Sequence, residues 1–549
     1  MSTTQTRGIV RHLGGESGHR SFFGGTHSKG RVALLIIFVV AGMVITVVAG
    51  WPGLLVGLVG VGVTMLVTTK THRGTIAERS RRRRRWKSRV ASGTDAFVPY
   101  DVAAWDQAEQ AVRAAKGRTE RWEAQRALVA MRANPDGADG MGWLQMGRGV
   151  AGIQWHAPIG ERAYLAVTFA VTGQLRGIES ISVMSRAAEG WGAFLASRAV
   201  PSVLVEDVQT MTRVLPADTA LQEFWVLNSL DESAPADAIK SYEEVLRRTG
   251  EGAMVQRHFI TVKWPVTAAF QDAARKYGEG RDGWRRLMGE EIASAHRGLT
   301  DARMGHVDVL SARQVAAVML HQQNPSRPID YVVDVHPSRV GIQSHDEFSA
   351  HIVEGADPLT GEPVEWWHRT AKITADALAT AGRTQLWMLD LLIGRDVQFI
   401  RSVSFHIHLV PAGEAKAAAQ RDLVRDQAEA MSKAEAGSVD LDETGTALSA
   451  SKRRRIDLRA GTGHHGASWV GYVTISARSR DELARYSRQL EETCSTGLGI
   501  EYLDWQDSYE AAASGTTWPI GRGITANDTS FSARIYRALA GKSEKEAIS

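Results

Sequence analysis

Histidine and acidic side chains gather at two places where their spacing could serve metal binding or acid–base chemistry. One group is Asp334, His336, His345 and His351, in a segment broken by proline and glycine. The other is His406 and His408, two apart on one face of an expected strand, a spacing that can serve a metal. No further ligand is placed by sequence spacing to complete either shell. The sequence therefore predicts no metal site and no cofactor, and an enzyme using residues 334–351 is the competing hypothesis.

Nucleotide chemistry requires a glycine-rich loop that ends in Gly-Lys-Ser/Thr. Gly541-Lys542-Ser543 supplies the last three residues, but Tyr536 occupies the position of the first glycine. The segment 461–466 is rich in glycine and lacks the lysine. Neither the zinc-protease pattern His-Glu-x-x-His nor the hydrolase pattern Gly-x-Ser-x-Gly occurs. We expect a protein that is not an enzyme.

Charge is distributed very unevenly along the 549 residues, although the formal net charge is only +4. Residues 1–31 and 70–90 are strongly basic, so the remaining chain is acidic. The basic cluster favours contact with anionic lipid head groups, and its alternative is DNA binding through phosphate contacts. The chain has one cysteine, Cys494, which excludes an intrachain disulfide framework and a cysteine-rich metal site.

Two uncharged apolar segments, 32–49 and 54–69, are separated by Gly50-Trp51-Pro52-Gly53. Their length approaches that of a membrane span, so we expect a two-helix transmembrane hairpin. Cations flank the hairpin on both sides and are missing from its turn, which predicts a multi-pass plasma-membrane protein with both termini cytoplasmic. The alternatives are a cleaved signal peptide and a hairpin buried inside a globular domain. The cations that follow the hairpin are Lys70, Arg73, Arg79, Arg81, Arg82, Arg83, Arg84, Arg85, Lys87 and Arg89.

Small residues recur at helical spacing on one face of each apolar segment, where they allow close approach of helix backbones. They are Gly42, Thr46 and Ala49 in the first segment, and Gly53, Gly57, Gly60 and Thr64 in the second. We interpret these faces as the contact between the two helices. The alternative is that part of this surface binds another membrane subunit.

The body that follows mixes strand and helix patterns, which predicts an α+β fold. Expected strands are 152–157, 163–171, 203–208, 257–264, 398–411, 469–477 and 499–503. Expected helices are 185–199, 282–296, 311–321, 412–436 and 481–493. The predicted organisation is a cytoplasmic tail 1–30, the hairpin 31–70, a basic segment and linker 71–139, a first α+β unit 140–325, a second unit 326–523 with a helical excursion 412–458, and a tail 524–549. The excursion is expected to project from the sheet.

The layout resembles an actinobacterial family of membrane proteins encoded in integrative conjugative elements. The residues that carry the resemblance are the hairpin with the run 78–87, the segments 256–262 and 469–475, Gly497-Leu-Gly-Ile-Glu501, and Trp518-Pro-Ile-Gly-Arg-Gly523. In that family, a hairpin similar to the small inner-membrane subunit of type IV secretion is fused to a body similar to the N-terminal domain of the traffic ATPase. The similarity covers roughly residues 31–523, and none of its motifs is catalytic.

The resemblance implies a non-catalytic inner-membrane component of a conjugative, type IV secretion-like DNA-transfer apparatus. It would act as a scaffold that docks a separate P-loop traffic ATPase and other secretion-channel subunits. The alternative function is a membrane-linked nucleic-acid-binding protein that uses the arginine run. Self-association and direct contact with nucleic acid are both left open.

Overall fold

The computed structural model describes residues 11–13, 29–68, 70–71, 74–158, 162–174, 179–216, 233–250, 254–327, 335–357, 361–379, 381–383, 387–393, 398–435, 452–453, 455–458 and 465–523. The predicted tail 524–549 and most of the second part of the predicted excursion 412–458 lie outside these residues.

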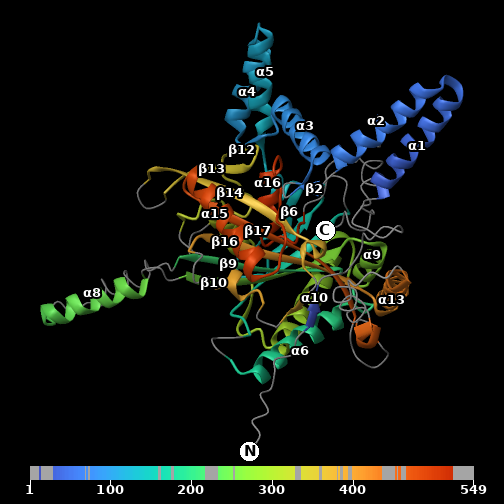
Figure 1. The fold of residues 1–549 in the computed structure, drawn as a ribbon. Coiled ribbons are helices and arrows are strands. Elements are labelled where there is room, and N and C mark those ends of the chain that lie inside the picture. Colours follow the sequence, from blue (N-terminus) through green and yellow to red (C-terminus); the bar gives the residue numbers. More distant parts are fainter. Residues whose placement is uncertain are drawn as a thin grey trace, which may run out of the picture.

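One mixed sheet of fourteen strands organises the described residues and confirms the α+β class (Figure 1). Its order is β5-β4-β12-β13-β14-β17-β16-β9-β10-β8-β7-β6, and β11 and β18 pair with β8 and β14. The strands are β4 (Ala96–Pro99), β5 (Met131–Arg132), β6 (Met141–Gln145), β7 (Ile153–His156), β8 (Tyr164–Val171), β9 (Asp207–Pro216), β10 (Met254–Pro265), β11 (Val307–Val309), β12 (Ser344–Glu347), β13 (Ala350–Ala356), β14 (Pro363–Ile373), β16 (Ile400–Val410), β17 (Gly466–Ala477) and β18 (Asp504–Trp505). Two short pairs lie outside the sheet: β1 (Arg11–Leu13) with β15 (Ala381–Arg383), and β2 (Lys70–Thr71) with β3 (Gly74–Thr75).

The centre of the sheet is the antiparallel pair β9 and β16. Arg401–His408 of β16 pairs with Asp207–Val214 of β9. Strands from 140–325 and strands from 326–523 therefore form one continuous sheet. Both strands have buried residues on both faces, which is what a central strand requires.

Helices cover the two faces of the sheet differently. The helices are α3 (Ile76–Ser92), α4 (Val102–Ala114), α5 (Arg118–Ala130), α6 (Ile181–Arg198), α8 (Ala236–Gly250), α9 (Ala268–Arg275), α10 (Gly280–Asp301), α11 (Ala312–Gln323), α12 (Leu389–Leu392), α13 (Ala412–Glu435), α15 (Arg480–Glu492) and α16 (Glu510–Ser514). Residues of α6, α9 and α10 form one apolar core with β8 and β10, and α12 and α15 form a second core with β16 and β17. On the opposite face, α11 forms a third core with Trp518 and Ile520.

Most expected elements are confirmed, with two exceptions. Residues 203–206 are not a strand, because β9 begins only at Asp207, where pairing with β10 begins. Residues 499–503 contain one isolated bridge, Leu378 with Ile500, and the short strand β18 follows at Asp504. Backbone partners, rather than local apolar content, decide both boundaries.

The expectation that the 412–436 helix projects from the sheet is wrong for its first turns. Ala415, Ala419 and Leu423 are buried at helical spacing along α13. Gly466, at the start of β17, lies so close to Ala415 that a Cβ at this glycine would collide with the alanine methyl group. A narrow alanine-rich stripe therefore packs against the start of β17, although the helix is rich in charge.

The apolar N-terminal region forms the helical hairpin α1 (Lys29–Ala49) and α2 (Trp51–Thr68), which extends away from the body in Figure 1. The turn is shorter than expected, because Gly50 alone reverses the chain with φ of +72°. α2 starts at Trp51, since Pro52 is tolerated in a first helical turn. The predicted segment boundary at residue 54 is thus three residues late.

The small residues make the contact between these two helices. A Cβ at Gly42 would lie 2.7 Å from Gly57 Cα, and one at Gly53 would collide with the backbone of Thr46. A Cβ at Gly60 would likewise collide with the ring of Phe38. The remaining predicted member with a described side chain, Thr64, is buried and donates to Gly60 O at 2.8 Å. The helices therefore approach at glycine, as sequence spacing predicted.

The expectation of a multi-pass plasma-membrane protein with cytoplasmic termini is wrong. Among the described residues, no helix combines the length and the apolar character needed to cross a membrane. α2 has 18 residues, about 27 Å of helix, and the uncharged part of α1 is no longer, whereas a span needs about 20 apolar residues.

Candidate functional site

One face of the sheet carries a row of buried polar side chains, brought together by strand register. Arg213 of β9 pairs with Ser402 of β16, which pairs with Thr474 of β17, which pairs with Thr370 of β14. A parallel row beside it joins His351, His368 and Ser476 across β13, β14 and β17. All seven side chains lie on the face opposite the two large apolar cores, because residues two apart on a strand share a face.

A C-terminal segment, residues 510–522, covers this polar face. Gln209 Nε2 donates to the carbonyl oxygens of Thr516 and Trp518 at 3.1 and 2.9 Å. Gln209 Oε1 accepts from Gly521 N at 2.8 Å. Thr168 Oγ1 donates to Pro519 O at 2.7 Å. The sheet thus uses side chains to satisfy the backbone of an irregular segment that would otherwise bury unpaired carbonyl groups.

His406 and His408, the pair with metal-compatible spacing, have separate partners. His406 Nε2 donates to Thr516 O at 2.9 Å, and burial lowers the pKa of His406 to about 4. His408 Nδ1 donates to Asp207 Oδ1 at 2.9 Å. Burial acts to raise the pKa of Asp207, but the Lys263 ammonium and the hydrogen bond from His408 bring it down to about 2. His406 therefore joins β16 to the segment 510–522, and His408 joins β16 to β9.

The histidines of the group 334–351 also have separate partners and do not meet at one site. His351 Nδ1 lies 2.8 Å from Asp346 Oδ1, and His345 Nδ1 lies 2.8 Å from Glu354 Oε1. Since His345 and Asp346 are consecutive on β12, the two pairs lie on opposite faces of the sheet. His336 Nδ1 accepts from Ser338 N, and Asp334 lies outside the described residues. No group of three or more potential metal ligands occurs among the described residues.

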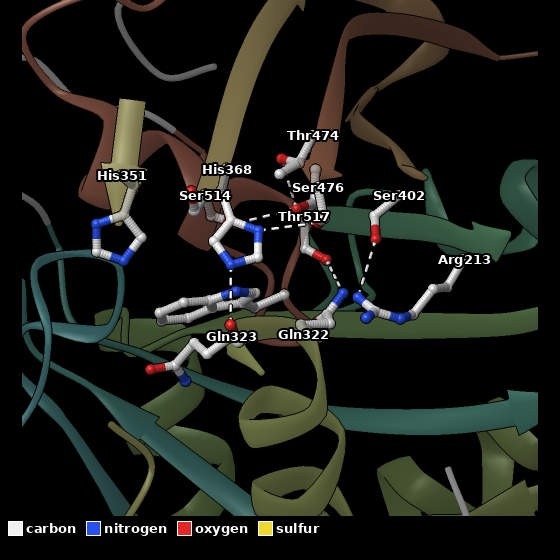
Figure 2. Close-up of a pocket in the computed structure, with 11 residues that line it drawn as sticks. Arg213, Gln322, Gln323, His351, His368, Ser402, Thr474, Ser476, Ser514 and Thr517 are labelled. Atoms are coloured by element: carbon white, nitrogen blue, oxygen red, sulfur yellow. Dashed lines mark hydrogen bonds between the residues drawn. The ribbon is translucent and has the colours of Figure 1, made fainter. Parts of the chain in front are cut away.

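A small cavity lies inside the polar face (Figure 2), and Trp518 is among the residues that line it. Arg213, Ser402 and Gln322 point toward one another on one side, and His368 and Ser476 lie on the other. The volume of about 10 Å³ suits one water-sized particle. The cavity is lined by Arg213, Gln322, Gln323, His351, His368, Ser402, Thr474, Ser476, Ser514, Thr517 and Trp518.

A second polar centre clamps α3 onto the body through Arg89. Its guanidinium donates to Asp346 Oδ2 and to Ser508 O, each at 2.7 Å. It also donates to Thr94 O at 2.9 Å and to Asp136 Oδ2 at 3.0 Å. Burial would raise the pKa of Asp346, but the hydrogen bond from His351 and the charge of Arg89 hold that pKa below its ordinary value.

The arginine run is therefore divided between two faces of α3. Arg82 Nη2 lies 2.5 Å from Asp504 Oδ1, and the guanidinium of Arg85 lies over the ring of Tyr509. Together with Arg89, these arginines follow helical spacing and face the body. Four other cations of this helix are exposed, and Arg81 is half-buried. The exposed ones are Arg79, Arg83, Arg84 and Lys87. Arg73 lies outside the described residues, and Lys70 belongs to β2.

Sequence reasoning missed both centres. The polar face is not visible in any one strand, since Arg213 meets Ser402, and Gln209 meets His406, only through the register of β9 with β16. The clamp left a readable signal: Arg82, Arg85 and Arg89 recur at i, i+3 and i+7 within the run. The high density of cations around them concealed that periodicity.

No protein-family model matches the chain, and no curated protein matches it either.

Proposed function

We propose that the protein is a non-catalytic docking component of a conjugative DNA-transfer apparatus, which holds a separate P-loop traffic ATPase and other channel subunits together. The observation that carries the proposal is the exposed apolar surface of the α1–α2 hairpin. Val47, Val48 and Trp51 at its tip are 87, 84 and 75% exposed. Apolar surface of this extent marks an interaction site.

The occupant of the hairpin surface is an apolar helix surface of another channel subunit. The hairpin uses its glycine faces for the contact between α1 and α2, so its outer faces present valine, leucine, isoleucine and methionine. No charged residue occurs from 32 to 69, and a charged partner surface would therefore lose hydration without gaining an ion pair.

The body supplies a rigid platform for the ATPase. Its sheet is continuous from β4 to β6, and the C-terminal segment 510–522 is bonded across the centre. The cavity beside Arg213 has room for one water-sized particle, far less than the 300–1,000 Å³ typical of small-molecule sites. Protein contact, and not turnover of a bound substrate, is the role this platform supports.

In this proposal, the docking site for the ATPase lies on α13. Its buried stripe fixes the helix to β17, whereas Glu414 and Lys416 are exposed. Exposed charges of both signs suit a partner surface in which complementarity sets association rate and specificity.

The experiment is quantitative capture of named partners on the tagged full chain, expressed in a host that carries the conjugative element. A P-loop ATPase and a channel subunit should co-purify with the wild type. Replacing Val47 and Leu58 with serine should release the channel subunit but retain the ATPase. Deleting 412–435 with a Gly/Ser link should do the reverse.

A matched control is serine at Tyr242 and Val245, two exposed apolar residues on α8. That variant should keep both partners. Loss of neither partner from the two test variants would refute the docking assignment, and capture of nucleic acid through Arg83 and Arg84 in place of both proteins would support the nucleic-acid-binding alternative.

A further inference from the structure

Arg213 is a buried cation in the middle of the sheet. Its side chain is 3% exposed, and β9, which carries it, lies between β10 and β16. Nη1 donates to Ser402 Oγ at 3.3 Å and Nη2 donates to His321 O at 3.0 Å. Both acceptors are uncharged. The Nε–H group is buried and has no hydrogen-bond partner.

Among the described residues, no carboxylate forms an ion pair with Arg213, in contrast to Arg89 with its two acidic partners. Burial lowers the pKa of Arg213 to about 9, so the side chain still carries its charge at neutral pH. Burial also lowers the pKa of His321 and His368, and the positive charge of Arg213 lowers both further. The positive charge of Arg213 therefore acts on both histidines.

The lining of the cavity is rich in hydrogen-bond donors. Ser402 accepts from Arg213, so its own hydroxyl hydrogen is available to another acceptor. His368 Nε2 must donate to Gln323 O, so its Nδ1 accepts from Ser476. Gln322 Nε2 donates to Thr517 O, which leaves Gln322 Oε1 as a buried acceptor without a partner. An occupant that accepts hydrogen bonds therefore belongs on the Arg213–Ser402 side.

We propose that this cavity binds a small monovalent inorganic anion, a halide such as chloride, which lies against the guanidinium of Arg213 and the hydroxyl of Ser402. A buried charge is costly unless it is paired, and an anion supplies the pairing that the described residues lack. Because the cavity has room for about one water-sized particle, a monatomic ion fits it better than sulfate, phosphate or a carboxylate. A water molecule would satisfy Nε–H and Gln322 Oε1 but would leave the charge uncompensated.

The test is unfolding of the purified full chain in sodium chloride, sodium bromide and sodium gluconate at equal ionic strength. Gluconate is too large for the cavity and reports the general salt effect. A ligand that binds only the folded state lowers the unfolding constant by the factor 1 + [L]/Kd. Chloride and bromide should therefore decrease the unfolding constant by this factor, which is about tenfold once the halide reaches nine times its dissociation constant.

Arg213→Met should abolish this halide-specific difference, and Ser402→Ala should weaken it and keep the charge. Arg84→Met, which removes an exposed arginine of α3, should leave it unchanged. Crystals soaked in bromide should show an anomalous peak within hydrogen-bonding distance of Arg213 in the wild type.

Equal unfolding in the three salts would overturn the proposal and leave water as the occupant. A halide effect that persists in Arg213→Met would overturn it too, because the anion would then bind elsewhere. If Arg213→Met fails to fold, two other measurements decide between a halide and water as the occupant. They are the halide dependence of unfolding in Ser402→Ala and the bromide peak in the wild type. None of these outcomes depends on the docking function.

Discussion

Replacing Arg89 with methionine should destabilise the protein strongly, although the residue belongs to a run of surface cations. The side chain makes four hydrogen bonds, two of them to carboxylates, and its side chain is 8% exposed. Asp346, whose side chain is fully buried, would keep His351 and lose the guanidinium of Arg89. Removing one member of a buried ion pair costs about 3–5 kcal/mol. Asp136 keeps Arg132 as a partner, so its contribution to the loss is smaller.

The assay is urea denaturation of the purified full chain, followed by circular dichroism, with Arg84→Met as the matched control on the same helix. The control removes an exposed arginine and should change the free energy of unfolding by less than about 0.5 kcal/mol. The double variant with Asp346→Asn should lose less than the sum of the two single variants, since both remove the same pair. If Arg89→Met costs under about 1 kcal/mol, or no more than the control, the clamp does not have the energetic role inferred from its geometry.

Three further variants test the hairpin, the buried histidines and the C-terminal segment. Gly53→Ala should separate α1 from α2 and speed amide exchange in both helices, measured by mass spectrometry, whereas Gly62→Ala, with open space at its Cβ, should not. The pKa of His406 is lowered to about 4, so the unfolded chain takes up this proton first and stability is lost as pH falls from about 6.5 toward 4. His406→Asn should reduce that slope by up to about 1.4 kcal/mol per pH unit. Gln209→Leu should lower the urea-measured free energy of unfolding by about 2 kcal/mol, because it leaves buried carbonyl groups unpaired; a loss under about 0.5 kcal/mol would contradict this.

The long strands of the body could be predicted because their pattern is local. β10 and β17 alternate or run apolar over most of their length, and the expected ranges differ from the observed bounds by only a few residues. The start of β9 could not be predicted in this way. Residues 203–206 have strand-like composition, but the ladder with β10 begins at Asp207. Strand formation there depends on a partner that is about fifty positions away in sequence.

The polar face of the sheet could be predicted only in part. Alternation shows that Ser402, Ser404 and His406 share one face of β16. It does not show that this face is buried, because polar residues on alternate positions ordinarily indicate a solvent-facing side. What reverses the expectation is the C-terminal segment, whose Trp518 and Ile520 cover the face and bring their backbone carbonyls to it.

The arginine run shows the same limit for charge. The cluster of cations predicted a surface that faces water or an anionic partner. Arg83 and Arg84 are compatible with that interpretation, because both are exposed. Arg89 and Arg82, at helical spacing within the same run, instead form ion pairs with Asp346 and Asp504, which are distant in sequence. The arginines of this run therefore lie on two faces of α3. The acidic partners Asp346 and Asp504 identify the face that packs on the body.

The hairpin α1–α2 is followed along the chain by α3, the helix that Arg89 holds to the body. α3 follows α2 after only the short pair β2–β3, and Arg89 ties α3 to Ser508 O, two residues before α16. α16 begins the segment that lies across the polar face, where Gly515 is in close contact with Gly137. The hairpin is thus connected to the body through α3, whose Arg82, Arg85 and Arg89 all contact residues of the body. Under the proposed function, the arginines of α3 that face the body would connect the docking surface of the hairpin to the sheet.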